Sequence, residues 1–272
     1  MGNFMKRMVV NVIGVPLVLG AIYFGGMVFV GLVLVISFFG MYEFYSLVRE
    51  KGFSPLSLFG IIAGLLWIIF VYVSMGFYEL VYGFILVFVT ILTLMQGVSG
   101  AIANASTTLF GFIYIPFFLS FLVRARVEFS NYASGYGLVL ILFVSVWACD
   151  SLAYLVGKVV GRHKLSPSVS PAKTVEGSIA GFLGSVAVFL VFYYSGWLAD
   201  VLDFPRTIVL GSIVGIFAQL GDLLESVFKR DVGVKDSGRI LPGHGGFLDR
   251  FDAFFVVSPV YYIFVKILIL VG

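Results

Sequence analysis

Apolar stretches of roughly twenty residues recur along almost the whole chain and are separated by shorter polar breaks. A helix needs about 20 predominantly apolar residues to cross the hydrocarbon core of a bilayer. The pattern therefore predicts an all-α, polytopic helical membrane protein with about nine transmembrane helices. The predicted spans are residues 8–25, 28–48, 55–74, 79–97, 107–123, 136–157, 177–197, 206–224 and 251–271.

Two of the breaks between spans are long and polar, and both lie in the second half of the chain. They cover residues 158–176 and 225–250, whereas the other connections are short. We therefore divide the chain into residues 1–135, with about five transmembrane helices, and residues 136–272, with about four. Because the second part contains both polar segments, it is the predicted catalytic part.

Composition supports the membrane assignment. Of the 272 residues, 61% are hydrophobic and 11% are charged, whereas a soluble domain has about 45–50% apolar and about 25% charged residues. Lys6 and Arg7 precede the first apolar run as in a signal peptide, but apolar sequence resumes directly after Gly26, which favours two retained spans. The single cysteine, Cys149, excludes an intramolecular disulfide, and the net charge of +3 gives no indication of a nucleic-acid partner.

The distribution of Lys and Arg predicts the orientation of the chain in the membrane. Cytoplasmic loops of membrane proteins carry an excess of these residues. If the N-terminus is cytoplasmic and nine helices cross, 13 of the 17 basic residues fall on the cytoplasmic side, together with both polar segments. The sequence therefore predicts a polar cavity that faces the cytoplasm.

Acidic residues flank the second polar segment at helical spacing. Asp222 and Glu225 end one predicted span, and Asp249 and Asp252 open the next. The i, i+3 spacing places both carboxylates of a pair on one helix face, and two such faces would gather the hard oxygen ligands that Mg²⁺ prefers. Asp150, late in an earlier span, is a further intramembrane acid for the same cavity. The alternative is interfacial ion pairing with the nearby cations Lys229, Arg230 and Arg250.

The segment between the acidic pairs is basic and rich in glycine, with five Lys and Arg residues in positions 229–250. Positive charge and accessible backbone N–H groups suit a polyphosphate, although the Gly-Lys-Ser/Thr end of a Walker loop is missing. A loop that contacts anionic lipid headgroups is the alternative. In the first polar segment, Thr174 or Ser170 is expected to cap the next helix, and Lys173 adds positive charge at its N-terminus.

Three stretches of the second polar segment resemble the signature of the phosphatidate cytidylyltransferases, also called CDP-diacylglycerol synthases. They are Ser226-Val-Phe-Lys229-Arg230, Lys235-Asp236-Ser-Gly238 and Leu241-Pro242-Gly-His244-Gly245-Gly246-Phe-Leu-Asp249-Arg250-Phe-Asp252. They show no departure from that signature. Residues 150–158 and 170–177 also resemble the family, so the likeness covers the C-terminal half, and the N-terminal spans agree only in length and hydrophobic pattern.

The resemblance implies transfer of CMP from CTP to phosphatidic acid, which yields CDP-diacylglycerol and pyrophosphate and requires Mg²⁺, with a second, monovalent cation as an option. For this reaction we expect Asp222 and Asp249 to bind the metal, supported by Glu225 and Asp252. The expected catalytic side chains are Asp222, Asp249, Lys229, Arg230 and His244. The expected substrate-binding side chains are Lys173, Thr174, Ser226, Lys235, Asp236, Arg239 and Arg250.

Other function classes remain as alternatives. A CTP-dependent lipid kinase of the polyprenol type would use the γ-phosphate of the same nucleotide, and an anion transporter would also need intramembrane charge. A transporter would place its charges near the midplane on broken helices, whereas here they concentrate at one interface.

We expect a multi-pass protein of the cell inner (plasma) membrane, with its active site facing the cytoplasm. A homodimer is expected because small-residue helix faces are plentiful.

Overall fold

The computed structural model describes residues 3–74, 76–95, 97–198, 201–241 and 245–271. The chain forms two compact units, and each unit combines segments that are distant in sequence. The first unit is Met1–Arg124 with Asp231–Phe251, and the second is Ala125–Arg230 with Asp252–Gly272. The predicted division into residues 1–135 and 136–272 concerns where catalysis takes place, and it stays a prediction.

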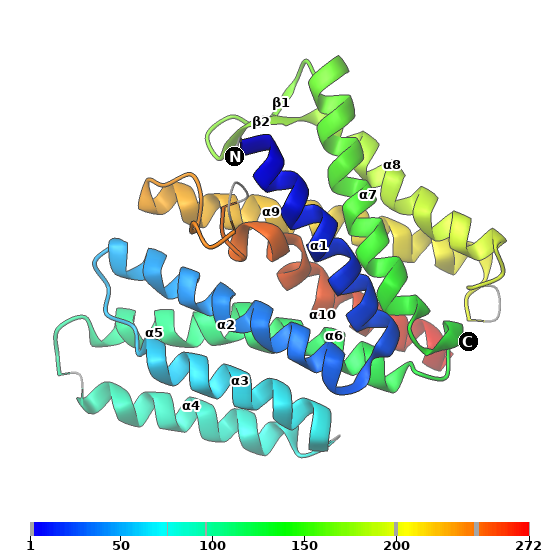
Figure 1. Ribbon diagram of the computed structural model, residues 1–272. Helices are drawn as coiled ribbons and strands as arrows, with labels where there is room; N and C mark the ends of the chain where they lie inside the picture. The colour runs from blue at the N-terminus through cyan, green and yellow to red at the C-terminus, as the bar shows by residue number, and fades with distance from the viewer. Residues whose placement is uncertain (1–2, 75, 96, 199–200, 242–244, 272) are drawn as a thin grey trace. The chain divides into compact units, whose positions relative to one another are not determined.

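Almost all of the described structure is helical (Figure 1). The N-terminal helices are α1 (Asn3–Phe24), α2 (Gly26–Glu50), α3 (Ser57–Ser74), α4 (Tyr78–Met95), α5 (Ala101–Phe112) and α6 (Phe118–Glu128). The later helices are α7 (Gly137–Val160), α8 (Val175–Tyr194), α9 (Phe204–Val232) and α10 (Leu248–Val271). A 3₁₀ turn covers Ala133–Gly135, and strands β1 (Lys164–Ser166) and β2 (Ser170–Thr174) form an antiparallel hairpin.

The prediction of a polytopic helical membrane protein is confirmed. Within the described residues, six helices are long and apolar enough to cross a membrane. Three shorter apolar helices, Val10–Phe24, Ser57–Val73 and Tyr78–Leu94, coincide with the other predicted spans. Each of the nine predicted ranges therefore falls on an apolar helix, and the number of helices that cross the bilayer stays a prediction.

A π-helical turn, Ile113–Phe117, joins α5 to α6 and contains Pro116. Proline has no N–H for the usual i to i−4 hydrogen bond, and its ring collides with the preceding turn. A single wide turn accommodates this local conflict without ending the helix. The stretch from Ala101 to Glu128 is therefore still long and apolar enough to form one membrane span.

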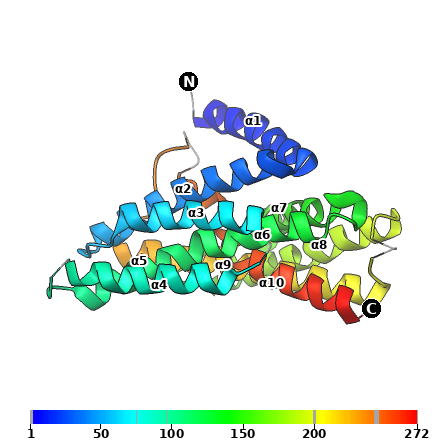
Figure 2. The same ribbon diagram turned by 90° about the horizontal axis from the view of Figure 1, so that it is seen from below.

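The first unit is organised around α2. This helix packs against α1, α3 and α5, and α3, α4 and α5 lie alongside one another (Figure 2). Tyr45 of α2 is fully buried, and its hydroxyl donates a hydrogen bond to the Thr108 carbonyl at 2.9 Å. Gly60 and Gly111 leave space for the Tyr45 ring, since a Cβ at either position would overlap it. These small residues allow the helices to approach an aromatic side chain closely.

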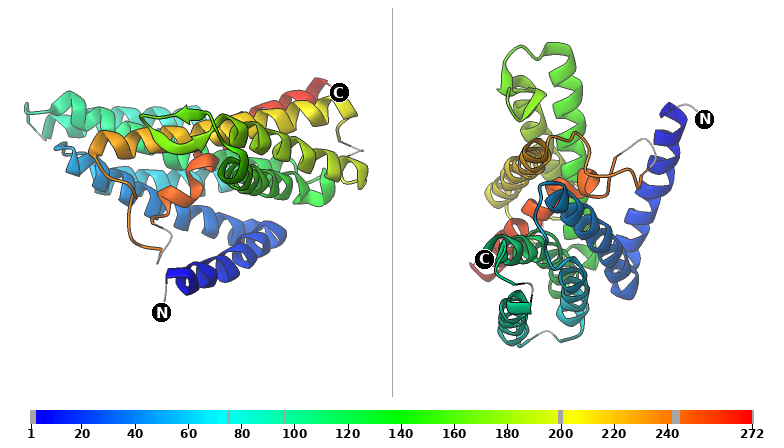
Figure 3. Two further views of the ribbon diagram at one scale, coloured as in Figure 1. Left: turned by 90° about the horizontal axis from the view of Figure 1, so that it is seen from above. Right: turned by 90° about the vertical axis from the view of Figure 1, so that its left-hand side faces the viewer.

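In the second unit, α7 and α8 pack along their length, and the β1–β2 hairpin lies at one end of the pair (Figure 3). Gly181 of α8 faces the backbone of α7, where an added Cβ would lie 2.7 Å from the Cys149 carbonyl oxygen. Gly211 and Gly215 of α9 face α8 in the same way, against Val186 and Phe182. These glycines of α8 and α9 are thus used for packing within the chain.

We expect Gly181→Ala to lower the free energy of unfolding by about 1–3 kcal/mol, because the new methyl group must push α7 and α8 apart. Gly83→Ala in α4 is the matched control, since nothing lies within 4 Å of a Cβ at that position. Thermal unfolding of both variants in one detergent measures the difference. Equal melting temperatures for the two variants would contradict the close α7–α8 packing.

Candidate active site

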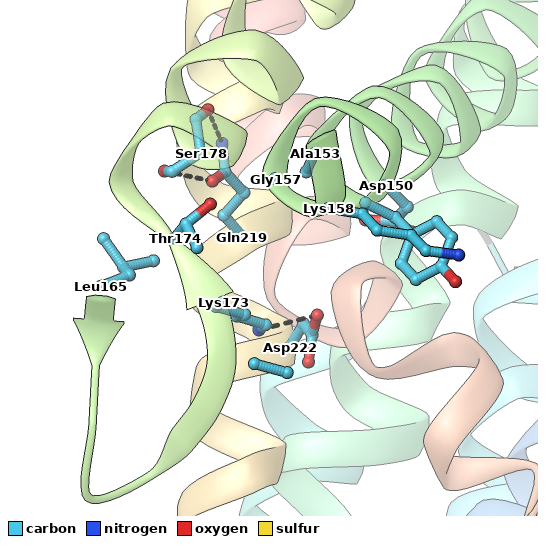
Figure 4. A pocket seen from close by; sticks show the side chains of 12 residues that line it. Asp150, Ala153, Gly157, Lys158, Leu165, Lys173, Thr174, Ser178, Gln219 and Asp222 are labelled. Carbon is cyan, nitrogen blue, oxygen red and sulfur yellow. Dashed lines mark hydrogen bonds and ion pairs between the residues drawn. The ribbon is translucent and has the colours of Figure 1, made fainter. Parts of the chain in front are cut away.

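A cavity of about 480 Å³ opens in the second unit between α7, the hairpin, α8 and α9 (Figure 4). Its charged and polar lining includes Asp150 and Lys158 from α7, Lys173 from β2, and Gln219 and Asp222 from α9. The cavity thus brings together residues that are up to 72 positions apart in the sequence, from Asp150 to Asp222. We place the candidate site in this cavity of the second unit.

The hairpin is fixed to the start of α8 by two hydrogen-bonding side chains. Thr174 is the N-cap of α8, and its Oγ1 accepts a hydrogen bond from the Gly177 N–H at 3.2 Å. The Glu176 carboxylate accepts from the backbone N–H groups of Arg162 and His163, and it lies 2.6 Å from His163 Nδ1. The prediction that Thr174 caps this helix is confirmed. The two contacts hold Lys173 on a defined strand beside the cavity.

Lys173 and Asp222 form an ion pair inside the cavity, with Lys173 Nζ 2.7 Å from Asp222 Oδ2 (Figure 4). Both side chains are partly exposed, at 26% and 34%, and line the cavity, whereas the Lys173 Nζ atom itself is buried. A predicted phosphate-binding cation and a predicted metal ligand therefore occupy one place. In this arrangement each side chain neutralises the charge of the other.

A second ion pair lies one turn further along α9. Lys229 Nζ is 2.5 Å from Glu225 Oε2, and the Glu225 side chain is fully buried. This i, i+4 pair continues the helix beyond the predicted end at residue 224, because oppositely charged side chains one turn apart stabilise it. Lys229 and Arg230 consequently lie in the last turn of α9 instead of in a loop, and Ser226 is buried on the same helix.

Arg230 connects α9 to the hairpin. Its Nε donates a hydrogen bond to the Val169 carbonyl at 3.1 Å, in the turn between β1 and β2. The predicted catalytic cation Arg230 is therefore linked to the same hairpin that presents Lys173. Two segments that the sequence placed in separate polar breaks meet through this contact.

Four carboxylates interact electrostatically in the second unit. Asp252, half-buried near the start of α10, interacts with Asp222 and Glu225 of α9 and with Asp150 of α7. Among the described residues, no three acidic, His or Cys side chains are arranged to hold a metal ion without other ligands. Mg²⁺ is usually bound by one or two carboxylates together with substrate phosphates and water. The concentration of carboxylate oxygens fits such a shared site, with Asp222 in the cavity.

Asp249 belongs to the first unit, within the part of the signature that covers residues 235–251, which we call the signature segment. Its Oδ2 accepts hydrogen bonds from Ser237 N–H and Ser237 Oγ, both at 3.0 Å, and from Gly246 N–H at 2.8 Å. Gly245 has a φ of +83°, a left-handed conformation that glycine adopts readily. The segment thus orients the Asp249 carboxylate. Joint metal binding by Asp222 and Asp249, which lie in different compact units, stays a prediction.

The remaining predicted residues are distributed along the signature segment. Lys235, Asp236, Arg239 and Arg250 are exposed. His244 lies outside the described residues, as do Pro242 and Gly243. The substrate-binding roles of the four exposed residues and the catalytic role of His244 stay predictions.

Sequence reasoning assigned no site role to four polar residues of the cavity, Tyr154, Lys158, Ser178 and Gln219. Ser178 Oγ donates to Gln219 Oε1, and Gln219 Nε2 donates to the Ser178 carbonyl at 3.1 Å. The signal was present, since Gln219 lies three residues before Asp222 in an otherwise apolar span. A polar side chain one turn from a predicted ligand, on the same helix face, is a candidate for the same cavity.

Comparison with known proteins places these features in a family. The model of the Cytidylyltransferase family matches residues 5–268. The chain belongs to the cytidylyltransferase family. It is 32% identical to the phosphatidate cytidylyltransferase of Synechocystis sp. (strain ATCC 27184 / PCC 6803 / Kazusa) over 288 residues, which cover 97% of both chains.

Two staphylococcal relatives are more similar over shorter regions. The phosphatidate cytidylyltransferase of Staphylococcus aureus (strain COL) is 46% identical over 160 residues, which cover 57% of each chain. That of Staphylococcus haemolyticus (strain JCSC1435) is 47% identical over 131 residues, which cover 48% of this chain and 50% of the relative. The resemblance inferred from the signature is thus confirmed, and it extends over nearly the whole chain. Membership of this family makes the protein a nucleotidyltransferase.

Proposed function

We propose that this protein is a phosphatidate cytidylyltransferase that transfers CMP from CTP to phosphatidic acid and releases pyrophosphate. The observation that carries the proposal is the cavity in which Lys173 pairs with Asp222, in a chain related over 97% of its length to a phosphatidate cytidylyltransferase. A phosphate-binding cation and a metal-binding carboxylate are the two groups that a transfer between two phosphate-bearing substrates needs. The lipid kinase alternative has no observation of its own in its favour.

The reaction needs little proton chemistry from the protein. The phosphate monoester of phosphatidic acid is already an anionic nucleophile at neutral pH, so no general base has to activate it. Its oxygen forms a bond to the α-phosphorus of CTP while the bond to the departing pyrophosphate breaks. The task of the protein is to bring two anions together, and Lys173 and Arg230 are the proposed groups that neutralise their charge.

A bound Mg²⁺ would neutralise charge on the triphosphate, and Asp222 is its proposed ligand in the cavity, with Asp252 in support. Asp249 is a further proposed ligand because the signature segment orients its carboxylate. Glu225 is fully buried and paired with Lys229, so we propose that it acts by holding that lysine. A second, monovalent cation stays an option of the proposal.

The proposal includes a location and an assembly. We propose that the protein lies in the cell inner (plasma) membrane and that its site faces the cytoplasm, where CTP is available. The bias of Lys and Arg toward one side of the nine predicted spans supports this orientation. A homodimer stays a prediction, and the glycines of α8 and α9 that pack within the chain do not support it.

The purified protein in lipid nanodiscs tests the proposed reaction. With CTP and Mg²⁺, we expect release of pyrophosphate that requires phosphatidic acid, measured with a coupled pyrophosphatase assay. Diacylglycerol, which lacks the phosphate nucleophile, is the matched control and should give none. Release of pyrophosphate at the same rate with either lipid, or no release at all, would contradict the proposal.

A further inference from the structure

Glu43 is a buried acid in a helix that otherwise packs through apolar side chains. It lies on α2, in the first unit, and its side chain is 2% exposed. A carboxylate removed from water loses hydration that must be replaced by hydrogen bonds. A charged residue inside a membrane helix is by default a functional candidate, and nothing in the site described above uses Glu43.

The partners of Glu43 all belong to the signature segment. Its Oε1 accepts a hydrogen bond from the Phe247 N–H at 3.1 Å, and its Oε2 accepts from the Leu248 N–H at 2.8 Å and lies 3.0 Å from Ser237 Oγ. Leu248 is the first residue of α10. The first N–H groups of a helix have no partner within the helix, and a carboxylate there also interacts favourably with the helix dipole. Glu43 therefore caps α10 from a different helix.

The shape of the segment matches this side chain. A Cβ at Gly238 or at Gly246 would overlap the Glu43 carboxylate, so glycine is needed at both positions for this contact. One turn earlier on α2, Phe39 stacks on Phe247 with ring centroids 4.7 Å apart. The signature segment is thus fitted to α2 by close backbone approach, by hydrogen bonds and by an aromatic contact.

Ser237 connects Glu43 to Asp249. Its hydroxyl oxygen lies 3.0 Å from Glu43 Oε2 and 3.0 Å from Asp249 Oδ2, and its N–H also donates to Asp249. Gly246, which donates its N–H to Asp249, lies directly against Glu43. The same few residues therefore contact both acids, and a shift of the segment away from Glu43 would turn the Asp249 carboxylate.

We propose that Glu43 is a positioning residue that holds the signature segment and the N-terminus of α10, and thereby orients Asp249. It acts through the segment and does not touch the substrates. Its effect on catalysis rests on the proposed function, whereas its effect on the segment does not. The N-terminal helices, which agree with the family in length and hydrophobic pattern, thus provide a specific side chain that holds the signature segment.

Hydrogen–deuterium exchange of the full-length protein in detergent tests the proposal without substrates. In Glu43→Gln, an oxygen remains at only one of the two carboxylate positions, so the NH₂ group at the other position faces the N–H of Phe247 or Leu248. We expect peptides that contain residues 237–250 to exchange about tenfold faster or more, since a hydrogen bond to a charged group is lost. Tyr45→Phe is the matched control, because it removes a buried hydrogen bond two residues away on α2 that points to Thr108. It should leave these peptides unchanged.

Gly238→Ala tests the same contact by changing the signature segment instead of Glu43, because the added Cβ would overlap the Glu43 carboxylate. This variant provides the test if Glu43→Gln fails to fold. We expect the same local increase in exchange. In the proposed reaction, Glu43→Gln should raise the Mg²⁺ concentration for half-maximal rate or lower kcat by about 10- to 100-fold, as is typical when a group that orients a metal ligand is lost. Glu43→Asp, which keeps the charge, should recover part of this loss.

Unchanged exchange in residues 237–250 for both Glu43→Gln and Gly238→Ala would overturn the proposal. Equal effects of Glu43→Gln and Tyr45→Phe on exchange and kinetics would also overturn it, since Glu43 would then be only a general contributor to the stability of α2. Because exchange is measured without CTP or phosphatidic acid, absence of cytidylyl transfer would contradict the proposed function and leave this result standing.

Discussion

Asp249→Asn is expected to lower kcat by about 10²–10³-fold while the protein stays folded. Three donors, from Ser237 and Gly246, converge on Asp249 Oδ2, and the amide oxygen of Asn can take that position. The NH₂ group then replaces the second carboxylate oxygen, so the charge available to a metal ion is lost while the segment keeps its anchor. Steady-state rates with CTP and phosphatidic acid, together with the melting temperature in detergent, measure the two effects separately.

Asp203→Asn is the matched control for this change. Asp203 accepts a hydrogen bond from the Arg206 N–H at 2.9 Å at the start of α9, and Asn serves equally well at a helix N-terminus. The activity of the Asp203→Asn variant should stay near that of the unaltered protein. Asp249→Ala should be both inactive and less stable, because the three donors lose their acceptor. Near-normal turnover of Asp249→Asn would remove Asp249 from the proposed ligands.

Lys173→Met is expected to lower kcat/KM for CTP by about a hundredfold or more. The substitution keeps an unbranched side chain of nearly the same length and removes the positive charge that lies in the cavity 2.7 Å from Asp222. A charge that stabilises the transferring phosphates contributes about 3–4 kcal/mol in comparable sites, and each 1.36 kcal/mol corresponds to a tenfold change in rate. Initial rates over a range of CTP concentrations give the ratio directly.

Lys164→Met provides the control within the same hairpin. Lys164 is exposed on β1 and pairs in register with Thr174 of β2, so its replacement changes the net charge equally but leaves the cavity intact. We expect it to retain most of the activity. If the two variants lose activity to the same extent, Lys173 acts only through the general positive charge of the hairpin, and its assignment to the cavity is wrong.

The membrane helices were the most predictable part of the structure, because their signal is local. Each apolar run of sufficient length gives a helix, and each predicted range falls on one. The cap at Thr174 was predictable for the same reason, since it depends on three neighbouring residues. The end of α9 was not predicted, because Glu225 and Lys229 read as the start of a polar loop, whereas their pairing extends the helix to Val232.

The site was only partly predictable, because its geometry depends on contacts between distant segments. The acids and cations were identified by their charge in an apolar chain, but the pairing of Lys173 with Asp222 depends on the hairpin, which the polar composition of residues 158–176 did not reveal. Glu43 was overlooked although it is a charge within a predicted span. Its partners, Ser237, Phe247 and Leu248, lie about 200 residues later, beyond the reach of any local pattern.

The fate of the phosphates of CTP tests the central claim most directly. The purified protein in nanodiscs is incubated with phosphatidic acid, Mg²⁺ and CTP that carries ³²P at either the α- or the γ-position. We predict that the α-label enters the extracted lipid in a reaction that requires phosphatidic acid, while the γ-label leaves as pyrophosphate. Transfer of the γ-label to a lipid, with release of CDP, would contradict cytidylyl transfer and identify a lipid kinase instead.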